Sequence, residues 1–288
     1  MTNNKTVTHF FPPKMHPGKM VVYVFLGLWS AFTAFVIFWV ILSSFKTNSE
    51  IFRNVFSFPK KFQFINYATA LSAEKFGLFF LNSIIVTSAS VIILLAISAP
   101  ASYVLSRVRF PGRRFLTSLY VAGIGIPYSI TLIPLFVIMT KLALINTLHG
   151  LVLIYVSLSI PFTVYILTGF FSSLPSELEE AGIIDGCNDF QVFGHIMLPL
   201  ASPGLITAAI FNGIGLWNEY QLVLVFVSNQ AKRTIALGLY SMQNSMEYTG
   251  NWVGLFAGVT IIMLPTIVLF VILSGRMISG LTMGGVKS

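Results

Sequence analysis

The stretch "MVVYVFLGLWSAFTAFVIFWVIL", residues 20–42, contains no charged side chain. A helix needs about 20 apolar residues to cross the hydrocarbon core of a bilayer. Lipid offers no hydrogen-bond partners, so the backbone of such a run must pair its own N–H and C=O groups as a helix. The run is too long for a signal peptide, and "SSFKTNSE" after it offers no small-x-small cleavage site. We therefore expect an uncleaved transmembrane helix here.

The same pattern recurs along the chain, which is 56% hydrophobic and only 9% charged. A soluble domain carries about 25% charged residues. Six uncharged runs are long enough to span a bilayer, and Glu219 is the only acid or base in any of them; the runs lie near residues 20–43, 80–105, 115–140, 150–173, 203–227 and 253–274. The sequence thus predicts an all-α, polytopic membrane protein with six transmembrane helices. These helices form one transmembrane domain over 20–275, between cytoplasmic tails at 1–19 and 276–288.

Basic residues indicate the orientation only weakly. With six spans both termini lie on one side, and if that side is the cytoplasm, nine basic residues lie inside and eight outside. The short loop "SRVRFPGRR", residues 106–114, holds four arginines. Short loops weigh most in the positive-inside rule. We therefore expect both termini and the segment 175–200 in the cytoplasm.

The segment "ELEEAGIIDGCNDFQVFGHIMLPL", residues 177–200, holds five of the nine acidic residues. Ser176 followed by Glu179 predicts a capping box at the start of a short helix. A turn at Asp185-Gly186 follows, and either Asn188 or Asp189 can cap a second helix, with Gln191 three residues after Asn188. The sequence therefore predicts a helix pair outside the bilayer.

The second helix of this pair carries Phe190, Phe193 and Met197 at helical spacing. One interpretation is a capped surface hairpin that merely joins the fourth and fifth spans. The other is a docking element, in which aromatic anchors enter a partner's groove while charges fix the register.

Several motifs resemble one known family. Glu180-Ala181-Gly182, Asp185-Gly186, Phe193, Ile196 and Leu198-Pro199 resemble the signature of binding-protein-dependent ABC transporter permeases. The motifs "NSIIVT" (82–87), "ASYVLSRVRFPGRR" (101–114), "LWNEYQLVLVFV" (216–227) and "RMISGLTMGGVKS" (276–288) resemble further parts of the carbohydrate-uptake branch, the second permease subunit of maltose-type transporters. One departure is visible, because the family's Glu-Ala-Ala reads Glu-Ala-Gly here. Gly182 should cost about 1 kcal/mol of helix stability relative to alanine.

The resemblance implies a function for the helix pair. In the family this loop is the coupling helix, which sits in a cleft of the ATPase subunit. The coupling residues implied are Glu177, Glu180, Ala181, Asp185, Gly186, Phe193, Leu198 and Pro199. The carboxy-terminal tail of the family reaches the ATPase dimer, which implies a contact at Gly284, Gly285 and Lys287; a solvated terminus is the alternative.

Glu219 lies within the fifth run, beside Trp217, Asn218 and Tyr220. Ionisable residues inside a membrane are functional candidates by default. These four residues are candidates for the translocation path, and a structural bond to a neighbouring helix is the alternative for Glu219. Prolines at 127, 134, 161 and 265 lie inside the runs, where they kink helices or line a transport path.

The resemblance implies a permease subunit of an ATP-driven importer for a sugar in the plasma membrane of a prokaryote. Its implied partners are a second permease, a dimer of ATPases that use ATP and Mg, and an extracellular binding protein. The chain itself shows no Walker A motif, no ligand-like spacing of its four histidines and a single cysteine, so we expect no catalytic residue, metal site or bound cofactor. Two other classes stay open from the residues alone: an ion-coupled secondary transporter acting alone, and a membrane scaffold.

Overall fold

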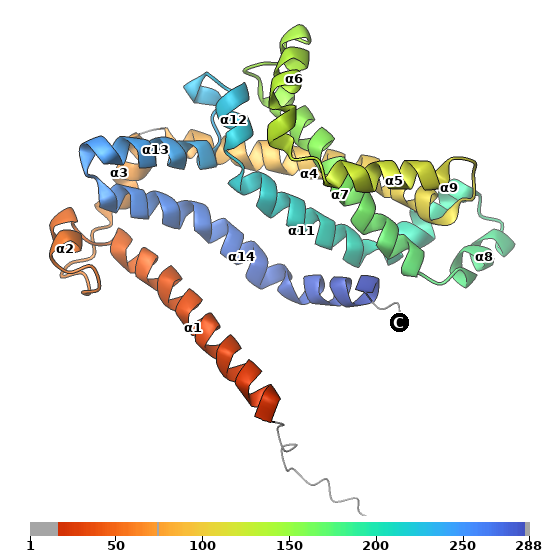
Figure 1. Ribbon diagram of the computed structural model, residues 1–288, viewed down its shortest axis with the longest axis horizontal. Coiled ribbons are helices and arrows are strands. Elements are labelled where there is room, and N and C mark those ends of the chain that lie inside the picture. The colour runs from red at the N-terminus through yellow and green to blue at the C-terminus, as the bar shows by residue number, and fades with distance from the viewer. Residues whose placement is uncertain (1–16, 74, 286–288) are drawn as a thin grey trace, which may run out of the picture.

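The computed structural model describes residues 17–73 and 75–285, and this part of the chain contains helices and no strand (Figure 1). The longer helices are α1 (Pro17–Ser44), α3 (Ile65–Ala73), α4 (Phe76–Arg107), α5 (Arg113–Ile124), α6 (Tyr128–Lys141), α7 (Leu148–Ser173), α8 (Glu177–Ile184), α11 (Ser202–Asn218), α13 (Ile235–Thr249) and α14 (Trp252–Gly285). The shorter ones are α2 (Asn48–Arg53), α9 (Asp189–Gln191), the π-helix η1 (Val192–Met197), α10 (Leu198–Leu200), α12 (Gln221–Phe226) and the 3₁₀ turn η2 (Gln230–Lys232). The all-α prediction is confirmed for the described residues.

Four described helices are long and apolar enough to cross a membrane: α1, α4, α7 and α14. Two bent pairs qualify as well if each pair forms one span. These pairs are α5 with α6, bent by 102°, and residues 189–200 with α11, bent by 68°. The structure thus contains four to six candidate spans by length and composition, and the exact number of six stays a prediction.

Two of the predicted spans are interrupted. The run 115–140 breaks between α5 and α6, where Pro127 precedes the first residue of α6. The run 203–227 is not one helix, because α11 ends at Asn218 and Glu219 is extended, with φ −73° and ψ 124°. The expectation that Glu219 lies inside a helix was therefore wrong. Its carboxylate instead accepts a hydrogen bond from the backbone N–H of Leu222, 2.7 Å away, at the start of α12.

Small and polar residues bring the central helices together. α4 packs along α7, and Ser102 of α4 donates hydrogen bonds to the carbonyls of Ser98 and Val164. Asn212 of α11, which packs on both α4 and α7, donates to the Thr163 hydroxyl of α7 at 2.9 Å. Without a hydrophobic driving force in lipid, close packing of small residues and interhelical hydrogen bonds hold such bundles together. α4, α7 and α11 therefore form the central layer.

The two ends of the chain differ in how they contact this layer. α14 packs against α11, whereas the main contact of α1 with a long helix is with α14. Figure 1 shows α1 diverging from α14 toward its N-terminal end. None of the most apolar part of α1 is buried within the chain. This helix therefore offers its surface to lipid or to another subunit.

Candidate coupling site

The acidic segment 175–200 folds as the predicted helix pair. α8 forms the first arm, and α9, η1 and α10 form a continuous second arm. Gly186 has φ +84°, a left-handed conformation that glycine adopts without steric cost, and it turns the chain between the arms. Of the two candidate caps, Asn188 is the one that forms. The backbone N–H of Gln191 donates to Oδ1 of Asn188, and the backbone N–H of Asn188 donates to Oε1 of Gln191, each at 2.9 Å.

The other predicted capping box, at Ser176 and Glu179, does not form. Ser176 has helical dihedral angles of −72° and −25°, and its side chain makes no capping hydrogen bond to α8. The side chain of Glu179 is directed to Arg107, the last residue of α4. A long-range ion pair has replaced the local cap.

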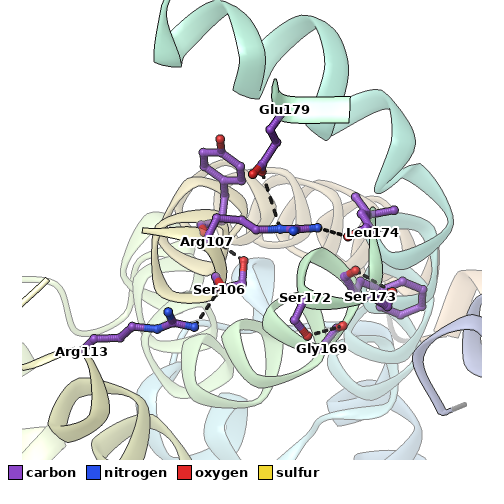
Figure 2. Close-up of polar contacts among 10 residues, drawn as sticks. Ser106, Arg107, Arg113, Gly169, Ser172, Ser173, Leu174 and Glu179 are labelled. Carbon is purple, nitrogen blue, oxygen red and sulfur yellow. Dashed lines mark hydrogen bonds and ion pairs between the residues drawn. The ribbon is translucent and has the colours of Figure 1, made fainter. Parts of the chain in front are cut away.

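Arg107 joins three elements at this end of the bundle (Figure 2). Its Nε lies 3.6 Å from Oε1 of Glu179, and its Nη2 donates a hydrogen bond to the carbonyl oxygen of Leu174, which follows α7. The side chains of Arg107 and Glu179 are only 13% and 18% exposed. A cation at the C-terminus of a helix is favoured by the helix dipole. Arg107 therefore binds the end of α7 and the first turn of α8 to the end of α4.

The adjoining loop is held in the same region. Arg113, the first residue of α5, donates from Nη2 to the Ser106 carbonyl at 2.9 Å (Figure 2). The arginine-rich loop 106–114 is thus folded back onto the end of α4, next to the contact with Glu179.

Three aromatic rings fix the second arm. Tyr103 of α4 lies 5.1 Å from Phe193 of η1 and 5.7 Å from Phe171 of α7, measured between ring centroids. The neighbouring Met197 and Val192 are buried in the same cluster. Aromatic pairs at such distances contribute about 0.5–1.5 kcal/mol each beyond their burial. The second arm is therefore attached to both α4 and α7 by packed side chains.

Gly182 lies where the two arms touch. A Cβ at this position would lie 2.5 Å from Cδ1 of Ile196, so that isoleucine occupies the space that the family's alanine would need. Because Cδ1 is the far end of a flexible side chain, an alanine at this position would require Ile196 to shift.

The outer surface of the pair combines apolar tips with acidic side chains. Ile184 at the end of α8 is 85% exposed, and Phe190 at the start of the second arm is 88% exposed. Both lie next to the turn at Gly186, with Asp185 and Asp189 beside them in sequence. A group of exposed large apolar side chains with a polar rim marks an interaction surface, whereas single exposed ones do not.

The structure brings the predicted coupling residues together on this one unit. Glu177, Glu180, Ala181, Asp185, Gly186 and Pro199 are exposed, whereas Phe193 and Leu198 are half-buried against the bundle. The sequence did not single out Arg107 or the exposed Ile184. The position of Arg107 at the end of the motif "ASYVLSRVRFPGRR" was the available signal, but its partner Glu179 lies in a distant part of the chain.

Glu219 lies at a second site, on the wall of a cavity of about 600 Å³. Its Oε2 accepts a hydrogen bond from the Tyr155 hydroxyl at 2.9 Å, and its Oε1 accepts from Leu222. The break between α5 and α6 forms another wall, with Pro127 and Tyr128. Serine and threonine hydroxyls add to the polar lining; they belong to Thr131, Ser157 and Ser159. The cavity therefore lies where two predicted spans are interrupted.

The neighbours of Glu219 have different surroundings. Trp217 is buried, and its indole N–H donates to the Ile262 carbonyl of α14 at 3.1 Å. Asn218 is exposed and donates to the Ile214 carbonyl, while the ring of Tyr220 stacks on Tyr240 at 4.9 Å. Among these four residues, Glu219 is the one that lines the cavity.

The remaining candidates add no further site. In the described part of the chain, no three His, Cys, Asp or Glu residues lie close enough to hold a metal ion. Residues Gly284 and Gly285 are the last of α14, and Lys287 lies outside the described residues.

Residues 93–281 match the family described as "Binding-protein-dependent transport system inner membrane component". The chain belongs to this family. It is a multi-pass membrane component of a binding-protein-dependent transport system, which sets aside the lone ion-coupled transporter and the scaffold. The matched residues include the whole helix pair and Arg107.

Sequence similarity to relatives extends over nearly the whole permease. It is 36% identical to a diacetylchitobiose uptake system permease of Streptomyces coelicolor, over 92% of this chain and 87% of the relative. It is 31% identical to a trehalose transport system permease of Mycobacterium tuberculosis, over 87% and 91%. A crystal structure of a bacterial ABC transporter involved in the import of the acidic polysaccharide alginate contains a chain with the same fold, at TM-score 0.77 and 23% identity, over 93% of this chain and 99% of that one.

Proposed function

We propose that this permease imports a sugar, powered by cytoplasmic ATPases that dock on the helix pair 175–200. The uptake systems to which its relatives belong, for diacetylchitobiose and trehalose among others, support the substrate class. Its partners are a second permease, a dimer of ATPases that bind ATP and Mg, and an extracellular sugar-binding protein.

The single observation that carries the coupling role is the exposure of Ile184 and Phe190 on a unit that is fixed to the bundle. A docking element must present anchors to its partner and must also transmit the partner's movement. The anchors are apolar and the rim is acidic, with Glu177, Glu180 and Asp185 exposed. The complementary surface is a groove with an apolar floor and basic edges.

The movement then passes to the bundle through two attachments. One is the contact of Arg107 with Glu179 and the end of α7, and the other is the packing of Phe193 on Tyr103 and Phe171. Because packed interfaces switch between discrete arrangements instead of deforming continuously, a shift of the helix pair moves α4 and α7 with it. Closure of the ATPases on ATP thereby reopens the bundle to the opposite side.

The sugar's path passes the cavity at Glu219. Its hydroxyl and carboxylate lining can exchange hydrogen bonds with a sugar, while Glu219 also holds the break before α12. Ser157→Trp, which fills this cavity, should abolish uptake while ATPase binding persists. Leu153→Trp, one turn earlier on α7 and 46% exposed, is the matched control. Unchanged uptake by Ser157→Trp would exclude the cavity from the path.

The docking role is tested by Phe190→Ala. The side chain is 88% exposed, so its truncation leaves the fold of the permease intact. An aromatic anchor contributes about 2 kcal/mol or more to an interface, so the ATPase should bind roughly 30-fold more weakly. Binding is measured by titrating purified ATPase onto the permease in nanodiscs.

The matched control is Tyr248→Ala, which removes an aromatic ring that is 89% exposed on α13. This variant should bind the ATPase like the unmodified protein. Equal binding by Phe190→Ala and Tyr248→Ala would place the ATPase elsewhere and overturn the proposed docking site.

A further inference from the structure

The loop after α1 exposes an unusual number of aromatic rings. Between residues 45 and 64 the chain holds six phenylalanines, and five of them are more than half exposed: Phe52 at 68%, Phe56 at 69%, Phe58 at 71%, Phe62 at 58% and Phe64 at 69%. Exposed rings in a flexible loop would not define a binding surface. The question is therefore whether this loop is ordered.

The loop is held by a dense set of hydrogen bonds. Lys46 is fully buried, and its Nζ donates to the Val55 carbonyl at 2.7 Å, which also accepts from the Trp39 indole at 3.0 Å. Glu50 accepts from the backbone N–H groups of Thr47 and Lys60 at 2.8 and 3.0 Å. These contacts hold the phenyl rings outward on an ordered scaffold.

The loop folds back alongside α1. The ring of Phe56 lies 6.3 Å from that of Phe35 and 6.2 Å from that of Trp39. Phe35 is nine residues before the end of α1, or about 13 Å along the helix at 1.5 Å per residue. The candidate span Gly18–Ser44 is about 40 Å long, against about 30 Å of hydrocarbon. The helix is therefore about 10 Å longer than the hydrocarbon layer. Even if all of this extra length projects beyond the bilayer at the Ser44 end, Phe35 still lies within the hydrocarbon layer, and Phe56 lies beside it.

The exposed charges of this loop are all basic. Its one acid, Glu50, is bonded to the loop backbone, and Lys46 is buried. Arg53, Lys60 and Lys61 are exposed among the phenylalanines. Aromatic rings at the level of the headgroups, mixed with lysine and arginine, are the pattern of a segment that lies in the membrane interface. Each such basic residue near an anionic surface is attracted to it.

We propose that residues 52–64 form a membrane-interface anchor, in which the phenylalanines enter the outer part of the bilayer that α1 spans and Arg53, Lys60 and Lys61 bind anionic headgroups. The segment fixes the depth of α1 and of the start of α14, which it also contacts through Phe52 and Trp252. This role does not depend on the sugar or on the ATPase.

The test places a nitroxide label at Phe58→Cys in the assembled transporter, in nanodiscs that contain phosphatidylglycerol. Cys187→Ser removes the one native cysteine of this chain, and the partner subunits are used without reactive cysteines. Collision of the label with oxygen, which concentrates in the bilayer, is compared with collision with a water-soluble nickel chelate. Lys61→Cys, three residues further on, is the matched control, and Phe25→Cys in the middle of α1 gives the value for full membrane depth.

We expect the ratio of oxygen to nickel collisions at Phe58→Cys to be several-fold higher than at Lys61→Cys and to approach that at Phe25→Cys. Replacing phosphatidylglycerol with phosphatidylcholine should lower the ratio, and glutamine at positions 53, 60 and 61 should abolish this lipid dependence. Equal nickel access at Phe58→Cys and Lys61→Cys would show a loop in water. Low collision with both reagents would show a protein partner on this surface. Either result would overturn the proposal.

Discussion

At the residue scale, Arg107 joins the helix pair 175–200 to the ends of α4 and α7. Its partners are the carboxylate of Glu179 and the carbonyl of Leu174, and the guanidinium is largely withdrawn from water. Removing one member of a buried charge pair leaves the other unpaired, which costs more than the pair itself contributes. The contact with Glu179 is an ion pair at 3.6 Å, and a small shift of α8 would bring it within hydrogen-bonding distance.

Arg107→Ala should uncouple transport from ATP hydrolysis. Hydrogen bonds to charged groups contribute about 1.5–3 kcal/mol, so we expect uptake per ATP to fall about tenfold or more. Arg107→Lys keeps the charge and should restore part of the coupling. The control is Arg109→Ala, an exposed arginine of the same loop. Uptake and ATPase rates are measured in the same proteoliposomes, and equal ratios for both alanine variants would contradict the role of Arg107.

Glu50 provides a prediction for pH. Hydrogen bonds from the backbone N–H of Thr47, and then from that of Lys60, lower the pKa of its carboxyl below the ordinary 4.5. Since the folded pKa is the lower one, the stabilisation is complete above the unfolded pKa and is lost as the pH falls through the folded value. The backbone amides of Thr47 and Lys60 should therefore exchange their hydrogens faster, after correction for intrinsic rates, once the pH falls below the folded pKa of Glu50. Glu50→Gln should lack this transition, and a transition that persists in Glu50→Gln would assign it to another group.

At the element scale, the contact of α7 with α11 sets how closely the central helices approach. A Cβ at Gly204 would lie 2.4 Å from the ring of Phe170, whereas one at Gly213 on the same helix would meet no atom within 4 Å. The ring of Phe170 is buried against the glycine, so it has little room to move. Only one of these two glycines is therefore required by packing.

Gly204→Ala should destabilise the permease, and Gly213→Ala should not. Overpacking typically costs about 1–3 kcal/mol. Replacing glycine with alanine raises helix propensity at both sites, so the difference in stability between the two variants reports the steric effect alone. Thermal unfolding in detergent measures both variants. A melting temperature that falls equally for the two would mean that the Phe170 contact does not limit the approach.

These elements also show what the sequence could and could not predict. The box at Asn188 and Gln191 followed from local chemistry, because both partners lie within one turn. The box at Ser176 failed because Glu179 pairs with Arg107, which no local pattern reveals. The run 203–227 is long enough to span a bilayer despite the polar residues 218–221, so the break at Glu219 was also missed. It depends on bonds from Tyr155 of α7 and from Leu222, and only the folded chain brings Tyr155 to this carboxylate.

At the scale of the whole molecule, the orientation is the feature that the charge pattern defines least. The basic residues divide nine against eight, and the short arginine loop decides for cytoplasmic termini. Docking of the ATPases on residues 175–200 requires these residues to lie in the cytoplasm. A measurement of the topology therefore also tests the proposed docking site.

Single cysteines in a Cys187→Ser background test this orientation. Tyr248→Cys should react with a membrane-impermeant maleimide in intact cells. Arg114→Cys should react only after the cells are opened. Both side chains are on described, exposed helix surfaces. The reverse pattern would place the helix pair on the wrong side for an ATPase.

The central claim is that a sugar at the binding protein controls ATP hydrolysis through the helix pair. The most direct measurement is the ATPase activity of the assembled complex in nanodiscs, with and without binding protein and a panel of sugars. We predict stimulation by one sugar class and its loss in Glu180→Lys, while the binding protein still captures that sugar. If no ATPase assembles with the permease and uptake instead follows an ion gradient, the coupling role is wrong and Glu219 becomes the residue to pursue.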